Sequence, residues 1–175
     1  VTALCVLNLN VALASAQATE TDLLAQLAEA DEAEANRLDR ELTLIWSRSG
    51  SPSMDLLLKR GREALEDEDY TTAIEHLSAL TDHAPGFAQG WHLRATAFYR
   101  KGLYGPALDD LERALALNPN NYNAIFGLGV MLHEFGNLSA ASELFHRVLA
   151  LHPHYEPAKE ALDRLAGQGV GQQTL

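Results

Sequence analysis

Between residues 54 and 155, apolar positions recur at helical spacing, and the pattern repeats every 34 residues. Three proline residues mark this interval: Pro85, Pro119 and Pro153. Each proline follows an apolar stretch and ends it as a helix, since proline lacks an N–H group. The period defines three units: 54–87, 88–121 and 122–155. Each unit predicts two helices joined by a short polar turn, at residues 54–67, 71–83, 88–101, 105–117, 122–135 and 138–151.

Small residues occupy two places in every unit, where we expect the paired helices to cross. The eighth place holds Gly61, Ala95 and Gly129, and the twentieth holds Ala73, Ala107 and Ala141. A larger side chain there would push the helix axes beyond their usual spacing of about 8–10 Å. Apolar residues, all of them bulky except Ala64, occupy the fourth, eleventh and twenty-fourth places and predict the buried stripe of each pair. The units are therefore expected to stack as antiparallel helical hairpins.

These positions resemble the tetratricopeptide repeat (TPR) family over about 100 residues, in one unbroken register. The resemblance implies an all-α fold, a right-handed superhelical solenoid of α-α hairpins. The seventh place, a leucine in the family, departs from this pattern with Arg60 and Arg94. We expect each arginine to lie along apolar surface with its guanidinium in water. The alternative is a semi-buried ion pair with an acid on a neighbouring helix.

Two flanking segments predict caps on this array. Leucine residues and Trp46 at helical spacing predict a hairpin, 20–30 and 33–47, that covers the first repeat. One long helix is the alternative, and Trp46 is expected to anchor the core. This cap and its linker make up residues 17–53. After the third unit, residues 156–166 predict an amphipathic capping helix, followed by a disordered tail over 167–175.

Residues 1–16 carry no charge and end in Ala14-Ser15-Ala16, the small-x-small pattern that signal peptidases accept. Charged residues begin at Glu20. This pattern predicts a secretory signal peptide without its basic start, and therefore export to the periplasm. The apolar run is shorter than the ~20 residues of a membrane-spanning helix, so no membrane span is expected. Cys5, the only cysteine, lies in this segment, which excludes a disulfide framework and a thiolate metal site.

The chain carries a net charge of −11, from 13 Lys and Arg residues against 24 Asp and Glu residues. Nucleic acids and anionic membranes would be repelled by this field. Acidic runs, such as Glu66 to Asp69 and Asp109-Asp110, are expected at solvated surfaces. No nucleotide-binding loop or nucleophile motif is found. The predicted protein is therefore not an enzyme and has no catalytic residues.

Histidine is the only residue type that suggests a metal, since His146, His152 and His154 lie close in sequence. A metal or small-ligand carrier is one alternative function, but no cysteine or carboxylate completes a known ligand spacing. The proline between His152 and His154 also favours an extended segment in which the rings point apart. We therefore predict no metal site and no cofactor.

The family resemblance implies a concave groove lined by the second, fifth, ninth, twelfth and thirteenth places of each first helix. These places give Leu58, Arg62, Leu65, Gln89, His92, Thr96, Tyr99, Arg100, Asn123, Phe126, Val130, His133 and Glu134. Tyr99, Phe126 and Val130 are of the kind that dominates binding energy. In chaperone-binding relatives a clamp of lysine, asparagine and arginine grips a carboxyl terminus. Its positions here hold Leu58, Arg62, Leu93, Asn123 and Gly127, so the clamp is absent.

The predicted function is that of a monomeric scaffold or adaptor in the periplasm, which binds a peptide or helix of another protein in this groove. The alternative is a non-catalytic accessory subunit of a cell-envelope enzyme or assembly machine.

Overall fold

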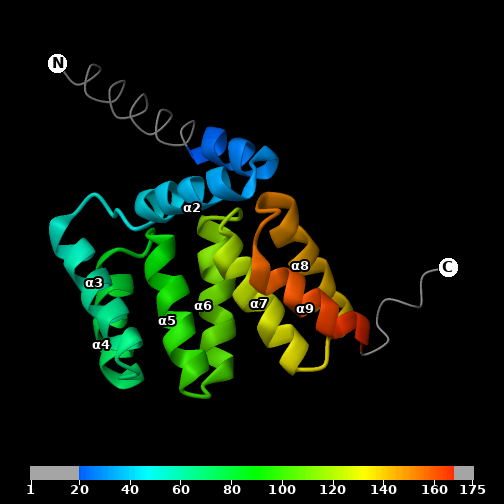
Figure 1. Cartoon of the computed structure of the whole chain (residues 1–175). Coiled ribbons are helices and arrows are strands. Elements are labelled where there is room, and N and C mark those ends of the chain that lie inside the picture. Colours follow the sequence, from blue (N-terminus) through cyan, green and yellow to red (C-terminus); the bar gives the residue numbers. More distant parts are fainter. Residues whose placement is uncertain (1–19, 168–175) are drawn as a thin grey trace.

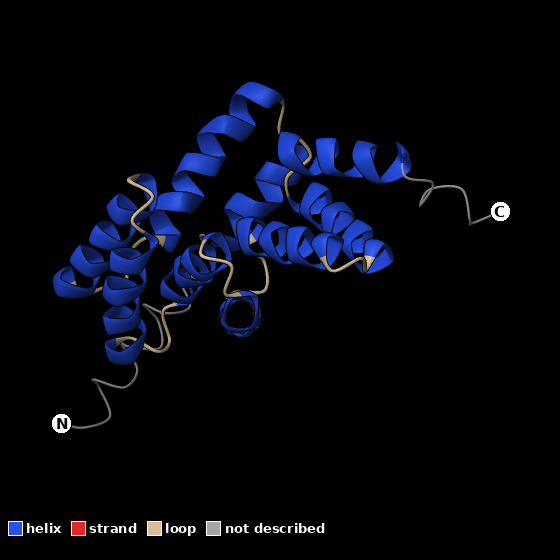
Figure 2. Ribbon diagram, turned by 90° about the horizontal axis from the view of Figure 1, so that it is seen from below, coloured by secondary structure: helices blue, strands red, loops and turns tan. Residues whose placement is uncertain are grey.

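The computed structural model describes residues 20–167, which form helices joined by short loops (Figures 1 and 2). After a helix over residues 20–29 come α2 (Glu32–Trp46), α3 (Pro52–Glu66), α4 (Tyr70–His83), α5 (Ala88–Arg100), α6 (Tyr104–Leu117), α7 (Tyr122–Glu134), α8 (Leu138–Leu151) and α9 (Glu156–Gly167). The six helices from α3 to α8 begin and end within two residues of their predicted positions. The all-α solenoid predicted from the repeat is therefore confirmed. The predicted signal peptide, residues 1–16, and residues 168–175 of the predicted tail lie outside the described range.

The paired helices cross closely where the sequence places its small residues. A Cβ atom added to Gly61 would lie 2.5 Å from Cγ of Leu77, and one added to Gly129 would lie 2.6 Å from Cε1 of Phe145. Ala95, at the same place in the second unit, is 1% exposed. The prediction that this place requires a small side chain is confirmed, because a larger residue would force the helices apart.

The turn inside each hairpin uses the left-handed backbone conformation at one place of the repeat. This place holds Glu68, Gly102 and Gly136, with φ angles of 58°, 78° and 80°. Glycine adopts this conformation without steric cost, whereas glutamate does not. The first hairpin therefore closes with local strain that the other two avoid.

The N-terminal hairpin, residues 20–46, does not cover the first repeat, and that expectation is wrong. Figure 1 shows α2 lying across the ends of the repeat helices. Apolar residues of the hairpin share one core cluster with α7, α8 and α9, whose members include Leu27, Leu38, Leu42, Tyr122, Phe145 and Leu165. The hairpin is therefore packed onto the third unit and the C-terminal helix.

Tyr122 explains this placement. Trp46, which is buried as expected of a core anchor, stacks edge-on against the Tyr122 ring at 5.1 Å between centroids. The Tyr122 hydroxyl donates to Oδ1 of Asp39 at 2.6 Å. The same place of the repeat holds Met54 in the first unit and Ala88 in the second. Only the third unit thus offers both an aromatic surface and a hydroxyl to the hairpin.

Arg94 forms the ion pair that was the less favoured expectation. Its Nε and Nη2 atoms donate to the two carboxylate oxygens of Asp110 at 2.7 and 2.8 Å, and Nη1 donates to Thr81 at 2.8 Å. The side chains of Arg94 and Asp110 are only 15% and 6% exposed. The expectations of a hydrated guanidinium at Arg94 and a solvated Asp110 are therefore wrong. Arg60 is exposed, in agreement with the expectation of a hydrated guanidinium.

The second unit alone carries this pair because it alone has an acid opposite the arginine. The place of Asp110 holds His76 in the first unit and Leu144 in the third. In the third unit both places are leucine, since Leu128 replaces the arginine. The third unit therefore has two apolar residues at the places that carry the ion pair in the second unit.

Candidate binding groove

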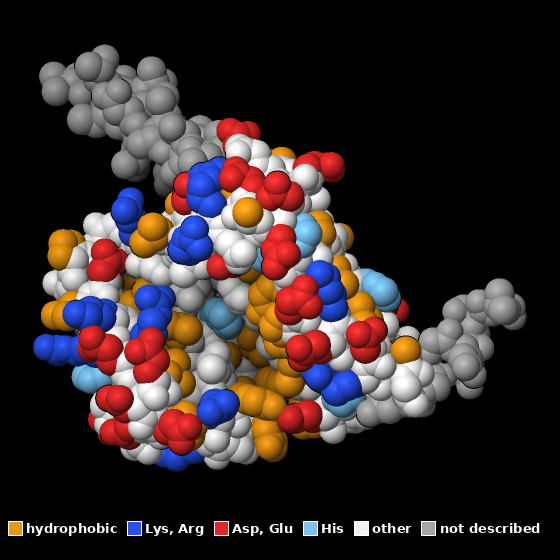
Figure 3. Space-filling view, viewed as in Figure 1, with side chains coloured by type: hydrophobic (Ala, Val, Ile, Leu, Met, Phe, Trp, Pro, Cys, Tyr) orange, Lys and Arg blue, Asp and Glu red, His pale blue; other side chains and the backbone are white. Residues whose placement is uncertain are grey.

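A groove of about 370 Å³ lies between α5 and α7, the first helices of the second and third units. Figure 3 shows a hollow on this face with orange apolar side chains inside it and charged side chains around it. The groove is lined by His92, Ala95, Thr96, Tyr99, Arg100, Leu111, Asn123, Phe126, Gly127, Val130, Met131 and Tyr155. Both helices contribute because stacking brings their inward faces together across the floor formed by Leu111 of α6.

Seven of the residues predicted for the groove lie together in it. They are His92, Thr96, Tyr99, Arg100, Asn123, Phe126 and Val130. Four more line smaller spaces that adjoin it, with Leu65 beside Arg62 and Glu134 beside His133. Arg62 lies in a recess of about 260 Å³ between α3 and α5, which shares Thr96 and Arg100 with the groove. His133 lies in a cavity of about 80 Å³ beside α9, which shares Val130.

Leu58 is not a groove residue, and that prediction is wrong. Its side chain is 2% exposed and packs in the core cluster that includes Leu77, Leu80 and Ala97. Because Ala97 belongs to α5, the second unit covers the inner face of α3 at this point. An aliphatic side chain at that place is therefore buried between units instead of facing the groove.

Tyr155 lines the groove, although the family pattern did not predict it. It lies in the loop before α9, and its hydroxyl donates to Oδ1 of Asn123 at 2.9 Å. Its ring packs against Phe126 at 5.3 Å between centroids. The family pattern names only places on first helices and could not identify it. An aromatic residue in the polar loop that ends the third unit was the available signal.

The floor of the groove is uncharged at neutral pH. Burial lowers the pKa of His92 to about 4, so its imidazole is neutral, and its Nδ1 atom has no hydrogen-bond partner among residues 20–167. Burial also raises the pKa of Tyr155 to about 12. The hydroxyl of Tyr99 donates to Oε1 of Glu134 at 2.5 Å, and burial together with this carboxylate raises the pKa of Tyr99 to about 12. The floor can therefore accept apolar or neutral polar groups without leaving one of these side chains charged and unpaired.

A family model described as tetratricopeptide repeat matches residues 58–108 and 92–156, which together cover more than half of the chain. The chain belongs to the tetratricopeptide repeat family. A TPR repeat-containing protein of Rhizobium etli is 28% identical over 146 residues, 83% of this chain and 72% of that protein. A human SGT1 homolog is 32% identical over 97 residues, and the match covers 55% of this chain and 27% of the human protein.

Solved structures agree with the fold of this TPR protein. The first TPR domain of Spaghetti (RPAP3), bound to an HSP90 peptide, superposes with a TM-score of 0.65 at 24% identity, covering 69% of this chain and 96% of that one. MamA superposes with a TM-score of 0.62 at 21% identity, and the match covers 80% of this chain and 86% of the MamA chain. At these identities the likeness establishes the fold alone.

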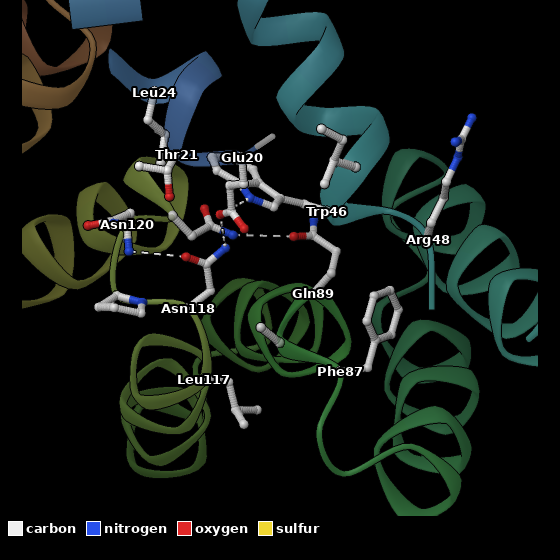
Figure 4. Close-up of a pocket in the computed structure, with 14 residues that line it drawn as sticks. Glu20, Thr21, Leu24, Trp46, Arg48, Phe87, Gln89, Leu117, Asn118 and Asn120 are labelled. Atoms are coloured by element: carbon white, nitrogen blue, oxygen red, sulfur yellow. Dashed lines mark hydrogen bonds between the residues drawn. The ribbon is translucent and has the colours of Figure 1, made fainter. Parts of the chain in front are cut away.

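A second cavity of the TPR protein, of about 490 Å³, lies under the N-terminal hairpin and contains Gln89, which had been predicted for the groove (Figure 4). Oε1 of Glu20 accepts from Nε1 of Trp46 at 2.7 Å and from Nδ2 of Asn118 at 3.0 Å. Oε1 of Gln89 accepts from Nδ2 of Asn121 at 3.4 Å. The hydrogen bond between Glu20 and Asn118 attaches the hairpin to the repeats, whereas the bond between Gln89 and Asn121 lies within the second unit.

The three histidines considered as metal ligands lie in different surroundings. His152 is buried against the rings of Tyr122 and Tyr155, and burial lowers its pKa. Nε2 of His154 lies 3.0 Å from the carbonyl oxygen of Ala30, while His146 is exposed. Within residues 20–167, no three His, Cys, Asp or Glu side chains are placed to hold a metal ion. None of the helices described is long and apolar enough to cross a membrane.

Proposed function

We propose that this TPR protein is a periplasmic scaffold that binds a segment of another protein in the groove between α5 and α7. The main support for this proposal is the groove itself, an open space of about 370 Å³ with aromatic and aliphatic walls and an uncharged floor. Tyr99, Phe126 and Val130 are only partly buried there. Their remaining apolar surface gains free energy when a partner covers it, at about 25 cal/mol per Å².

Peptide complexes of related domains support a binding role. The first TPR domain of Spaghetti is bound to an HSP90 peptide, and a second TPR structure is the TPR2B complex of yeast Sti1 with Hsp70. The clamp that grips a carboxyl terminus is absent here, so we propose recognition through the apolar groove instead. An extended or helical segment can place two or three side chains in such a groove.

Two pairs of substitutions test the groove. Tyr99→Ala with Val130→Ala removes apolar surface from the groove, whereas Leu44→Ala with Leu56→Ala removes exposed leucines from α2 and α3 that do not line it. Each variant and the wild type would be used for affinity capture from a native envelope extract, with circular dichroism to verify helicity. We expect one protein to be lost with the groove variant and retained with the control. A protein retained by both variants would refute binding through the groove.

Export is proposed from residues 1–16 alone, on their apolar, uncharged composition and their Ala-x-Ala ending. Mass spectrometry of the protein purified from its native cells tests this proposal. A mature chain that begins at Gln17 is the expected result, and a chain that retains residues 1–16 would refute it.

A further inference from the structure

Two arginine side chains line the recess between α3 and α5, at one end of the groove. Arg62 and Arg100 both line this space of about 260 Å³, together with Leu65, Tyr70 and Thr96. Neither guanidinium donates a hydrogen bond to a carboxylate of the described chain. The recess is continuous with the groove because Thr96 and Arg100 line both.

Hydroxyl groups hold the two guanidinium groups in place. Nη2 of Arg62 donates to Oγ of Ser47 at 3.0 Å, so the residue that caps the end of α2 positions this arginine. Nε of Arg100 donates to the Tyr70 hydroxyl at 3.2 Å, and its guanidinium lies 5.6 Å from the centre of that ring. Neutral acceptors orient a guanidinium without cancelling its charge. Arg94 differs in this respect, because a carboxylate neutralises it.

The residues that line the recess carry two positive groups and one negative group. Glu66 also lines it, so two guanidinium groups face one carboxylate. Glu68 lies 3.9 Å from Arg100, but its side chain is 74% exposed, so water and salt screen the interaction. The chain as a whole has a net charge of −11, so this local excess of positive charge stands out. A bound carboxylate would complement it.

We propose that the segment bound in the groove presents the carboxylate of an Asp or Glu side chain to Arg62 and Arg100, and an aliphatic or aromatic side chain to the adjoining space between α5 and α7. This inference rests on the proposed function and adds the partner's chemistry and its orientation, with the acidic end toward α3. Planar guanidinium groups bind carboxylates through paired charge-assisted hydrogen bonds. A strongly acidic partner is disfavoured by the overall charge, so the recess selects a single acid.

The test begins with selection of a phage-displayed library of random 12-residue peptides on the full chain. An enriched peptide is then labelled with fluorescein and titrated by anisotropy with three proteins. They are the wild type, Arg62→Gln with Arg100→Gln, and a control, Lys59→Gln with Arg60→Gln. The control removes the same two charges from exposed positions on α3 outside the recess.

We expect enriched peptides to carry Asp or Glu at a fixed spacing from a large apolar residue. The recess variant should weaken binding by about tenfold or more, and the control by less than about twofold. Changing the peptide's acid to its amide should weaken binding to the wild type by the same factor. The same change should not weaken binding to the recess variant any further, because both changes remove the same interaction.

Other results would overturn the inference in distinguishable ways. Peptides without acids, which bind the recess variant normally but fail to bind Tyr99→Ala with Val130→Ala, would refute the carboxylate and leave the groove function standing. Peptides insensitive to both variants would refute the groove function as well. Light scattering could instead detect a dimer of the wild type that the recess variant does not form. This result would show that the occupant is a second copy of this chain, and it would overturn the proposal that a segment of another protein binds there.

Discussion

Replacing Asp110 by alanine removes one half of the buried ion pair that joins α5 to α6. Arg94 would keep its hydrogen bond to Thr81 at 2.8 Å and its position over the Trp91 ring at 4.8 Å. It would lose both charge-assisted hydrogen bonds to the carboxylate. Because its side chain is only 15% exposed, water could replace these bonds only in part.

This geometry determines how much stability Asp110→Ala should lose. Breaking a buried ion pair by removal of one partner typically costs about 3–5 kcal/mol. The remaining hydroxyl and ring contacts of Arg94 favour the lower end, so we expect Asp110→Ala to reduce the free energy of unfolding by about 3 kcal/mol. For a chain of this size, that corresponds to a fall in melting temperature of roughly 6–12 °C.

The third unit suggests the matched control, since leucine occupies both equivalent places at Leu128 and Leu144. Arg94→Leu with Asp110→Leu should therefore be within about 1 kcal/mol of the wild type, because apolar residues can replace a buried ion pair without loss. Urea unfolding followed by circular dichroism at pH 7 would measure all three proteins. A loss below about 1 kcal/mol for Asp110→Ala, or a double variant as unstable as the single one, would refute this reasoning.

Two further predictions concern the close helix crossing and the buried imidazole. Gly129→Ala should lower the free energy of unfolding by about 1–2 kcal/mol, because its Cβ would meet the Phe145 ring at 2.6 Å. Gly127→Ala, whose Cβ would have no contact closer than 3.6 Å, should instead raise the free energy of unfolding by up to about 1 kcal/mol. Thermal unfolding compares the two variants, and equal effects would contradict the packing argument. Because the folded state holds the pKa of His92 near 4, below its unfolded value of 6.5, stability should be intact above pH 6.5 and fall as the pH drops toward 4, by up to about 3 kcal/mol. His92→Gln should reduce this slope in urea unfolding measured from pH 7 to 4, and an unchanged slope would show that His92 does not cause it.

Much of the fold could be predicted from the sequence because a repeat encodes the same local contacts several times. The 34-residue spacing of Pro85, Pro119 and Pro153 located all six repeat helices, since the helical period and the helix-ending proline are local properties. The small residues at the helix crossings were equally predictable, because the paired helices are neighbours in sequence. Seven of the proposed groove residues came from the family resemblance, whose groove places lie on one face of each first helix.

The tertiary structure alone decided which distant residues meet. The period placed Arg94 and Asp110 within their unit but did not show that their side chains would be buried together, and it placed Leu58 on a face that α5 covers. The N-terminal hairpin docks on Tyr122, which no repeat rule specifies. The recess of Arg62 and Arg100 likewise depends on two units and on the residue that caps the end of α2. A periodic pattern describes contacts within a unit and between adjacent units. Contacts with elements outside the repeat depend on three-dimensional shape and on the burial of side chains far apart in the chain.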